Sequence, residues 1–128
     1  MHGKTVLITG GTNGIGLETA RGLARMGARV IITGRDASKT ASTLEDLKRS
    51  TGNPNIHSLL GDLSLMSETR RLASEFVAQY DRLDVLINNA GGIFQTRKFT
   101  PEGLEYTFAL NHMSYYLLTR LLLDTITA

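Results

Sequence analysis

Short apolar runs alternate along the chain with longer segments in which apolar residues recur at helical spacing. The short runs cover residues 5–9, 29–33, 56–60 and 85–88, and the helical segments follow them at residues 15–26, 38–50, 66–80 and 102–124. Runs that are apolar throughout are typical of parallel strands covered by helices on both faces. The pattern therefore predicts an α/β fold, a doubly wound parallel sheet built from four βα units.

The residues at the ends of the helical segments support this division. Gly27 and Gly52 follow the first and second segments, and Asp36 or Ser38 can cap the second. Thr100-Pro101 predicts the start of the fourth helix, with proline at the first helical position.

Composition narrows the class of protein. The 128 residues are 41% hydrophobic and 20% charged, which is typical of one globular domain over residues 1–128. No apolar stretch reaches the ~20 residues of a membrane span, the first residues leave no room for a signal peptide, and there is no cysteine. We therefore expect a cytoplasmic protein.

Charge and histidine content exclude further classes. The net charge is only +2 and the basic residues are scattered, so a small anionic ligand is favoured over nucleic acid. The three histidines show no ligand spacing, and we expect no metal site.

The sequence "TGGTNGIG", residues 9–16, joins the first predicted strand to the first helix. A glycine-rich turn before a helix is suited to a phosphate, because the first helical N–H groups are free and the helix dipole is positive there. Gly10 would permit the tight turn, Gly14 close approach of a pyrophosphate, and Gly16 close helix packing. No Gly-Lys-Ser/Thr follows, so a dinucleotide is favoured over a Walker-type site, with an ordinary loop as the alternative.

Several motifs together resemble the short-chain dehydrogenase/reductase family. Its Thr-Gly-x-x-x-Gly-x-Gly motif matches residues 9–16, and further matches occur at Gly61-Asp62-Leu63, at Asn88-Asn89-Ala90-Gly91 and at Asn111. Residues 102–124 look most like the retinol-dehydrogenase-like branch. The resemblance covers nearly the whole chain and implies a Rossmann fold with strand order 3-2-1-4, without the family's later strands.

The glycine turn and the resemblance together imply a nicotinamide dinucleotide site. Its expected residues are Thr9, Gly10, Thr12, Asn13, Gly14, Ile15, Gly16, Arg35, Asp62, Leu63, Asn88, Ala90 and Gly91. The resemblance places Asp62 and Leu63 at the adenine, with a helix cap as the alternative role of Asp62. It also places Asn88, Ala90 and Gly91 at the nicotinamide half, whereas Asn89 is expected to be structural.

Thr33-Gly34-Arg35, at the end of the second strand, bears on the choice of cofactor. Gly34 removes the carboxylate that would repel a 2′-phosphate, and the Arg35 guanidinium is suited to bind one. We therefore predict NADP(H) in preference to NAD(H). The alternative is that Arg35 is a solvated loop charge. The neighbouring carboxylate of Asp36 weakens the 2′-phosphate assignment, unless Asp36 caps the second helix.

Of the family's catalytic residues, only Asn111 has a counterpart here. The resemblance implies that it interrupts its helix and supports a water-linked proton relay. The family's catalytic serine, which would lie on a fifth strand, and its Tyr-x-x-x-Lys motif have no counterpart here, and Tyr116 with Arg120 is not a convincing substitute. His112 is expected to pack or lie on the surface rather than act as a general base.

The resemblance therefore predicts the cofactor-binding half of an oxidoreductase that interconverts alcohol and carbonyl substrates. The 128 residues alone are expected to be inactive, and they represent either part of a longer reductase or a half-domain completed by another chain. The alternative function is a non-catalytic nucleotide-binding interaction or sensor module. A homo-oligomer through the apolar fourth helix is compatible with both.

Overall fold

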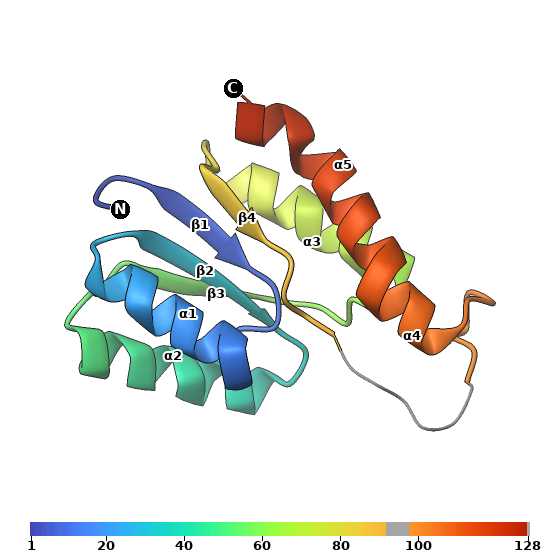
Figure 1. The fold of residues 1–128 in the computed structure, drawn as a ribbon, viewed down its shortest axis with the longest axis horizontal. Helices are drawn as coiled ribbons and strands as arrows, with labels where there is room; N and C mark the ends of the chain where they lie inside the picture. The colour runs from blue at the N-terminus through green and yellow to red at the C-terminus, as the bar shows by residue number, and fades with distance from the viewer. Residues whose placement is uncertain (92–97, 128) are drawn as a thin grey trace.

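The computed structural model describes residues 1–91 and 98–127 (Figure 1). Its elements are β1 (Thr5–Ile8), α1 (Gly14–Arg25), β2 (Arg29–Gly34), α2 (Ala37–Thr51), β3 (Ile56–Leu60), α3 (Met66–Gln79), β4 (Val85–Ile87), α4 (Tyr106–Phe108), a π-turn (Ala109–Met113) and α5 (Ser114–Thr127). From β1 to β4, each element begins and ends within one residue of its predicted bounds. The α/β alternation predicted by the apolar periodicity is therefore confirmed over this part of the chain.

The four strands form one parallel sheet in the order β3-β2-β1-β4, which confirms the doubly wound fold. Leu7 at the centre of β1 is in register with Ile31 of β2 on one side and Leu86 of β4 on the other. Among the described residues, β3 and β4 form the edges. The chain crosses from β3 to β4 over the central pair. Because all four strands are parallel, their carboxyl ends meet at one edge of the sheet.

Each face of the sheet has its own hydrophobic core. Val6, Ile8, Val30 and Ile32 pack with Leu47 and the alanines of α1 on the face covered by α1 and α2. The opposite face is covered by α3 and α5 (Figure 1), and its buried residues are Leu7, Ile31, Leu59, Leu63, Leu72, Ala73, Phe76, Leu83, Leu118 and Leu122. Side chains of successive strand residues point to opposite faces, so each apolar strand contributes to both cores.

The fourth helix begins later than the sequence predicts. Residues 101–103 form a turn in which the Gly103 amide donates to the Thr100 carbonyl at 2.9 Å and Gly103 has a φ of +82°. Helical geometry starts only at Tyr106, where the Glu105 carboxylate accepts hydrogen bonds from the amides of Thr107 and Phe108. The predicted start at Thr100-Pro101 is wrong, because a left-handed glycine two residues after the proline cannot continue a right-handed helix.

A π-turn at Ala109–Met113 separates α4 from α5. It places Asn111 in the widened turn, so the predicted interruption of this helix at Asn111 is confirmed. None of the helices in the described ranges is long and apolar enough to cross a bilayer.

Candidate functional site

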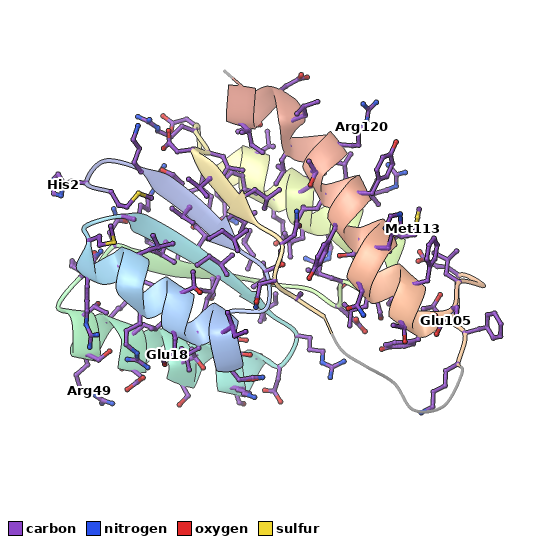
Figure 2. The ribbon with its side chains drawn as sticks, viewed as in Figure 1. His2, Glu18, Arg49, Glu105, Met113 and Arg120 are labelled. Carbon is purple, nitrogen blue, oxygen red and sulfur yellow. The ribbon has the colours of Figure 1, made fainter. Side chains whose placement is uncertain are left out.

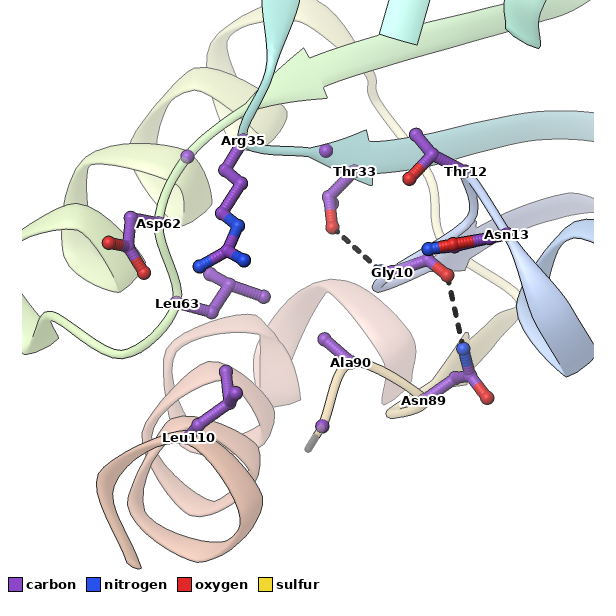
Figure 3. A pocket seen from close by; sticks show the side chains of 13 residues that line it. Gly10, Thr12, Asn13, Thr33, Arg35, Asp62, Leu63, Asn89, Ala90 and Leu110 are labelled. Carbon is purple, nitrogen blue, oxygen red and sulfur yellow. Dashed lines mark hydrogen bonds between the residues drawn. The ribbon is translucent and has the colours of Figure 1, made fainter. Parts of the chain in front are cut away.

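A cavity of about 350 Å³ lies at the carboxyl edge of the sheet, in the size range of small-molecule sites. Its lining comes from the end of β2, from the loops that follow all four strands and from the π-turn (Figure 3). The lining residues are Gly10, Thr12, Asn13, Thr33, Gly34, Arg35, Gly61, Asp62, Leu63, Asn89, Ala90, Gly91 and Leu110. This is the edge at which open α/β sheets bind ligands.

The glycine turn is fixed by neighbouring strands. The Gly10 amide donates to Thr33 Oγ1 at 3.0 Å, and the Gly10 carbonyl accepts from Asn89 Nδ2 at 3.1 Å (Figure 3). The Gly11 amide donates to the Thr33 carbonyl at 3.1 Å. The turn is thus held from the ends of both β2 and β4, which fixes its position relative to the cavity.

Close approach of neighbouring atoms excludes side chains at Gly10 and Gly16, among other glycines of the turn. A Cβ on Gly10 would lie 2.8 Å from Ala90 Cα, and one on Gly16 would lie 2.3 Å from both Asn89 Nδ2 and the Gly10 carbonyl oxygen. Gly10 and Gly14 both have a left-handed backbone, with φ of +69° and +61°, but nothing lies within 4 Å of the Cβ position of Gly14. Gly16 is therefore required by packing, Gly10 by packing and backbone conformation, and Gly14 by backbone conformation beside open space.

The electrostatics of the turn suit an anion. Asn13 precedes α1 without making a side-chain capping bond, and the first turn of α1 contains no acidic residue. The amides at this positive helix end therefore remain for a ligand. Two cations lie near the turn: Arg35 lines the cavity, and Lys39 Nζ is 3.4 Å from Asn13 Oδ1.

Arg35 extends from the end of β2 across the cavity toward Leu63 (Figure 3). Asp36, the next residue, caps α2 by accepting a hydrogen bond from the Lys39 amide at 2.9 Å. The predicted cap at Asp36 is confirmed. Its carboxylate is therefore engaged at the helix end, which removes part of the objection to Arg35 as an anion ligand.

Asp62 and Leu63 form the wall between β3 and α3. Asp62 Oδ1 accepts hydrogen bonds from the Ser64 amide at 3.0 Å and from Ser64 Oγ at 2.7 Å. The N-cap residue of α3 is Leu65, and it has no side-chain capping bond. Asp62 therefore orders the turn before α3 rather than capping the helix, and the helix-cap interpretation is wrong.

The amides at the start of α3 are bound by a residue from another part of the chain. The two carboxylate oxygens of Glu102 accept from the amides of Met66 and Ser67, the second at 3.0 Å. These two backbone hydrogen bonds lower the pKa of the Glu102 carboxyl. No local sequence signal identifies this contact, because the partners are 35 and 36 residues apart.

Asn111 lies behind the Ala90–Gly91 wall of the cavity. A Cβ on Gly91 would lie 2.6 Å from Asn111 Oδ1 and 3.5 Å from the hydroxyl oxygen of Tyr115. Burial raises the pKa of Tyr115, which keeps its hydroxyl neutral. The π-turn thus brings an amide and a phenol to the same short stretch of backbone.

Of the predicted site residues, some line the cavity and the others lie outside its lining. Eight line the cavity: Gly10, Thr12, Asn13, Arg35, Asp62, Leu63, Ala90 and Gly91. Thr9 is buried behind it, and its hydroxyl oxygen accepts from the amides of Asn89 and Ala90, both at 2.9 Å. Ile15 is 80% exposed on α1.

Of the two asparagines after β4, Asn88 has different surroundings from those predicted. Asn88 Nδ2 donates to Thr119 Oγ1 on α5 at 3.1 Å, so Asn88 joins the strand end to a helix and is absent from the cavity lining. Asn89 both lines the cavity and binds the Gly10 carbonyl. The expected structural role of Asn89 is present, together with a place in the wall.

Thr33 and Leu110 also line the cavity and were missed by sequence reasoning. Thr33 follows from the register, because the end of a strand next to the glycine turn can reach its amides. No sequence feature identified Leu110 as a cavity residue, because it is one of several apolar residues in the predicted helix. In the described part of the chain, no three His, Asp or Glu side chains are grouped so that they could hold a metal ion.

The whole arrangement matches a known family. The family model described as short chain dehydrogenase matches residues 4–128. The chain belongs to the short chain dehydrogenase family. The family resemblance inferred from the motifs is thus confirmed.

Individual relatives show how much of a family member the chain represents. It is 41% identical to human polyprenol dehydrogenase over 123 residues, covering 96% of the chain and 37% of the relative. Human retinol dehydrogenase 13 is 38% identical over 126 residues, with 98% and 38% covered, which bears out the similarity to the retinol-dehydrogenase-like branch. The chain therefore spans less than half the length of these curated relatives.

Solved structures agree with the fold. The NADP active-site complex of RhlG from Pseudomonas aeruginosa superposes with a TM-score of 0.84 at 35% identity. That superposition covers 98% of this chain and 48% of the other.

Proposed function

We propose that the chain forms the NADP(H)-binding part of an oxidoreductase that interconverts an alcohol and a carbonyl compound. The observation that carries the proposal is the cavity at the carboxyl edge of the sheet, bordered by the glycine turn and by Arg35. Support comes from family membership and from the structural similarity to RhlG, which was solved as an NADP complex.

The residues fit a dinucleotide in three respects. The start of α1 offers uncapped amides to a pyrophosphate, and Gly14 leaves open space in front of the turn. Arg35 offers a guanidinium to a 2′-phosphate, with Gly34 in place of the acid that would bind a free 2′-hydroxyl. Asp62 and Leu63 provide a polar and an apolar surface for the adenine.

When bound, the nicotinamide ring supplies or accepts a hydride. The residues of this chain would bind and orient it: Ala90 and Gly91 line the cavity, and Asn111 Oδ1 closely approaches the backbone of Gly91. The catalytic serine and the Tyr-x-x-x-Lys motif expected from the family have no counterpart in these 128 residues. We therefore propose that the chain binds the cofactor but does not turn over substrate by itself.

The test is fluorescence titration of the chain with NADPH and with NADH, before and after Arg35→Ala. We expect tighter binding of NADPH in the parent. Losing one charge-assisted contact should cost about 1.5 to 3 kcal/mol, or roughly ten- to a hundredfold in NADPH affinity, with little change for NADH. Arg25→Ala is the matched control, because it removes the same charge from the exposed far end of α1. Equal affinity of the parent for both dinucleotides would contradict the 2′-phosphate assignment, and alcohol oxidation by these 128 residues alone would contradict the expected inactivity.

A further inference from the structure

We propose that Glu102 is a positioning residue for the cofactor cavity. It lies outside the cavity and holds two of the cavity's walls in place relative to each other. This inference rests on the proposed cofactor-binding function. The observation that supports it is that a carboxylate from the segment before α4 is bound to the start of α3. The first wall is the Asp62–Leu63 loop and the second is the π-turn with Leu110, and Glu102 is absent from the lining of either.

The α3 side of the contact is directly continuous with the first wall. The Leu65 amide donates to the Asp62 carbonyl at 3.1 Å, and α3 begins at the next residue, Met66. Leu65 offers no side-chain cap, so the amides of Met66 and Ser67 depend on Glu102. A carboxylate is favoured here, because the helix dipole is positive at this end.

The Glu102 side of the contact is connected to the second wall by a closed set of hydrogen bonds. The Thr100 amide donates to the Leu104 carbonyl at 2.7 Å, and the Tyr106 amide donates to the Lys98 carbonyl at 2.8 Å. Glu105, at the start of α4 (Figure 2), then caps that helix and leads into the π-turn. Movement of Glu102 would therefore be passed on to Leu110 and Asn111.

The two walls meet at one hydrophobic core. Leu63 is 4% exposed and belongs to the core between α3 and α5, and Leu110 packs against that same core. Apolar contact between the walls is not directional, so it permits sliding. The two hydrogen bonds of Glu102 add direction and fix how far the π-turn lies from α3.

Glu102→Gln tests the inference, with titration by NADPH and by adenosine 2′,5′-bisphosphate. The variant should spend less time with the π-turn in its binding position, which weakens apparent affinity for the dinucleotide. We expect NADPH binding to weaken about three- to tenfold, within the range of a lost helix cap. Binding of adenosine 2′,5′-bisphosphate should not change, because that probe reaches Arg35 and Asp62 but not the nicotinamide half.

Two further variants control for charge. Glu45→Gln removes the same charge from an exposed position on α2 and should leave both affinities unchanged. Glu102→Asp keeps the carboxylate on a side chain one methylene shorter and should fall between the parent and Glu102→Gln. Equal weakening of both probes, or unchanged NADPH binding in Glu102→Gln, would overturn the inference.

Amide hydrogen exchange provides a measurement that needs no cofactor. In Glu102→Gln, protection should fall at Met66 and Ser67 and also across Leu110 and Asn111. Loss confined to the start of α3 would mean that Glu102 is only a local cap and would overturn the inference. If the parent binds neither dinucleotide, the proposed function fails, while hydrogen exchange still decides the role of Glu102.

Discussion

The two sides of the cavity are built in different ways. The glycine turn is held by short backbone contacts and by neutral groups, namely the hydroxyls of Thr9 and Thr33 and the amide of Asn89. The side formed by α4 and the π-turn is held by carboxylates bound at helix starts, that of Glu102 at the start of α3 and that of Glu105 at the start of α4. The first side tolerates almost no change in shape, whereas the second depends on charge and on partners distant in sequence.

The largest expected effect is at Thr9, which joins the glycine turn to the end of β4. Thr9→Val keeps the side-chain shape but removes the oxygen that accepts from the amides of Asn89 and Ala90. Because Thr9 is 1% exposed, water cannot replace that oxygen, and we expect a loss of about 3 kcal/mol in the free energy of unfolding. Urea denaturation measures it.

Thr9→Ser is the control for this prediction, since it retains the hydroxyl. It should lose less than half as much stability as Thr9→Val. If the valine variant were as stable as the parent, the hydroxyl would not be what holds the strand end to the turn.

The next effect compares two glycines of α1. Gly16→Ala places a methyl group 2.3 Å from the Gly10 carbonyl oxygen, so α1 must move away from the turn. We expect a loss of about 2 kcal/mol in unfolding free energy. Gly22→Ala is the matched control, because nothing lies within 4 Å of its Cβ position and alanine favours a helix. Thermal denaturation should give opposite signs for the two variants, and a loss in both would refute the packing role of Gly16.

The smallest effect is a loosening of the second side in acid. The pKa of Glu102 is lowered in the folded chain by the amides of Met66 and Ser67. Its contribution to stability is therefore complete above the unfolded pKa of about 4.3 and is lost as pH falls through the folded-state pKa. Glutamine at this position cannot titrate, so the change should be absent in Glu102→Gln.

Hydrogen exchange at pH 6 and near pH 3.5 measures this loosening, after correction for intrinsic exchange rates. The amides of Met66 and Ser67 should lose protection several-fold, and those of Gly10 and Ala90 should change much less. Parallel loss on both sides of the cavity would show that the neutral and charged contacts are not independent.

Much of the fold follows from local sequence patterns. Apolar runs such as Val6-Leu7-Ile8 identify the strands because each residue is buried on one face or the other, and Gly52 ends α2 in the left-handed conformation. The start of the fourth helix was harder to predict, because a proline with a glycine two residues later occurs both at helix starts and in turns. Gly103 forms a turn here as part of a closed set of hydrogen bonds, which no short window of sequence reveals.

The cavity was predictable where its residues come shortly after strands. Gly10, Arg35, Asp62 and Ala90 each lie within three residues of a strand end, and all line the cavity. Asn88 and Asn89 show the limit, because the chain turns at the end of β4 and strand alternation no longer says which side chain faces the cavity. Glu102 was missed because its contact with α3 depends on how two segments dock, which requires tertiary structure.

The π-turn at Ala109–Met113 has a consequence for the phase of the helix that contains it. One extra residue in a turn rotates everything before it by about 100° relative to everything after it. Leu118 and Leu122 can thus point into the sheet while Leu110 faces the cavity. Deleting a single residue from the turn would restore an ordinary helix, but it would rotate Leu110 and Asn111 away from their present neighbours. The irregular backbone therefore lets one half of this helix pack on the sheet while the other half lines the cavity.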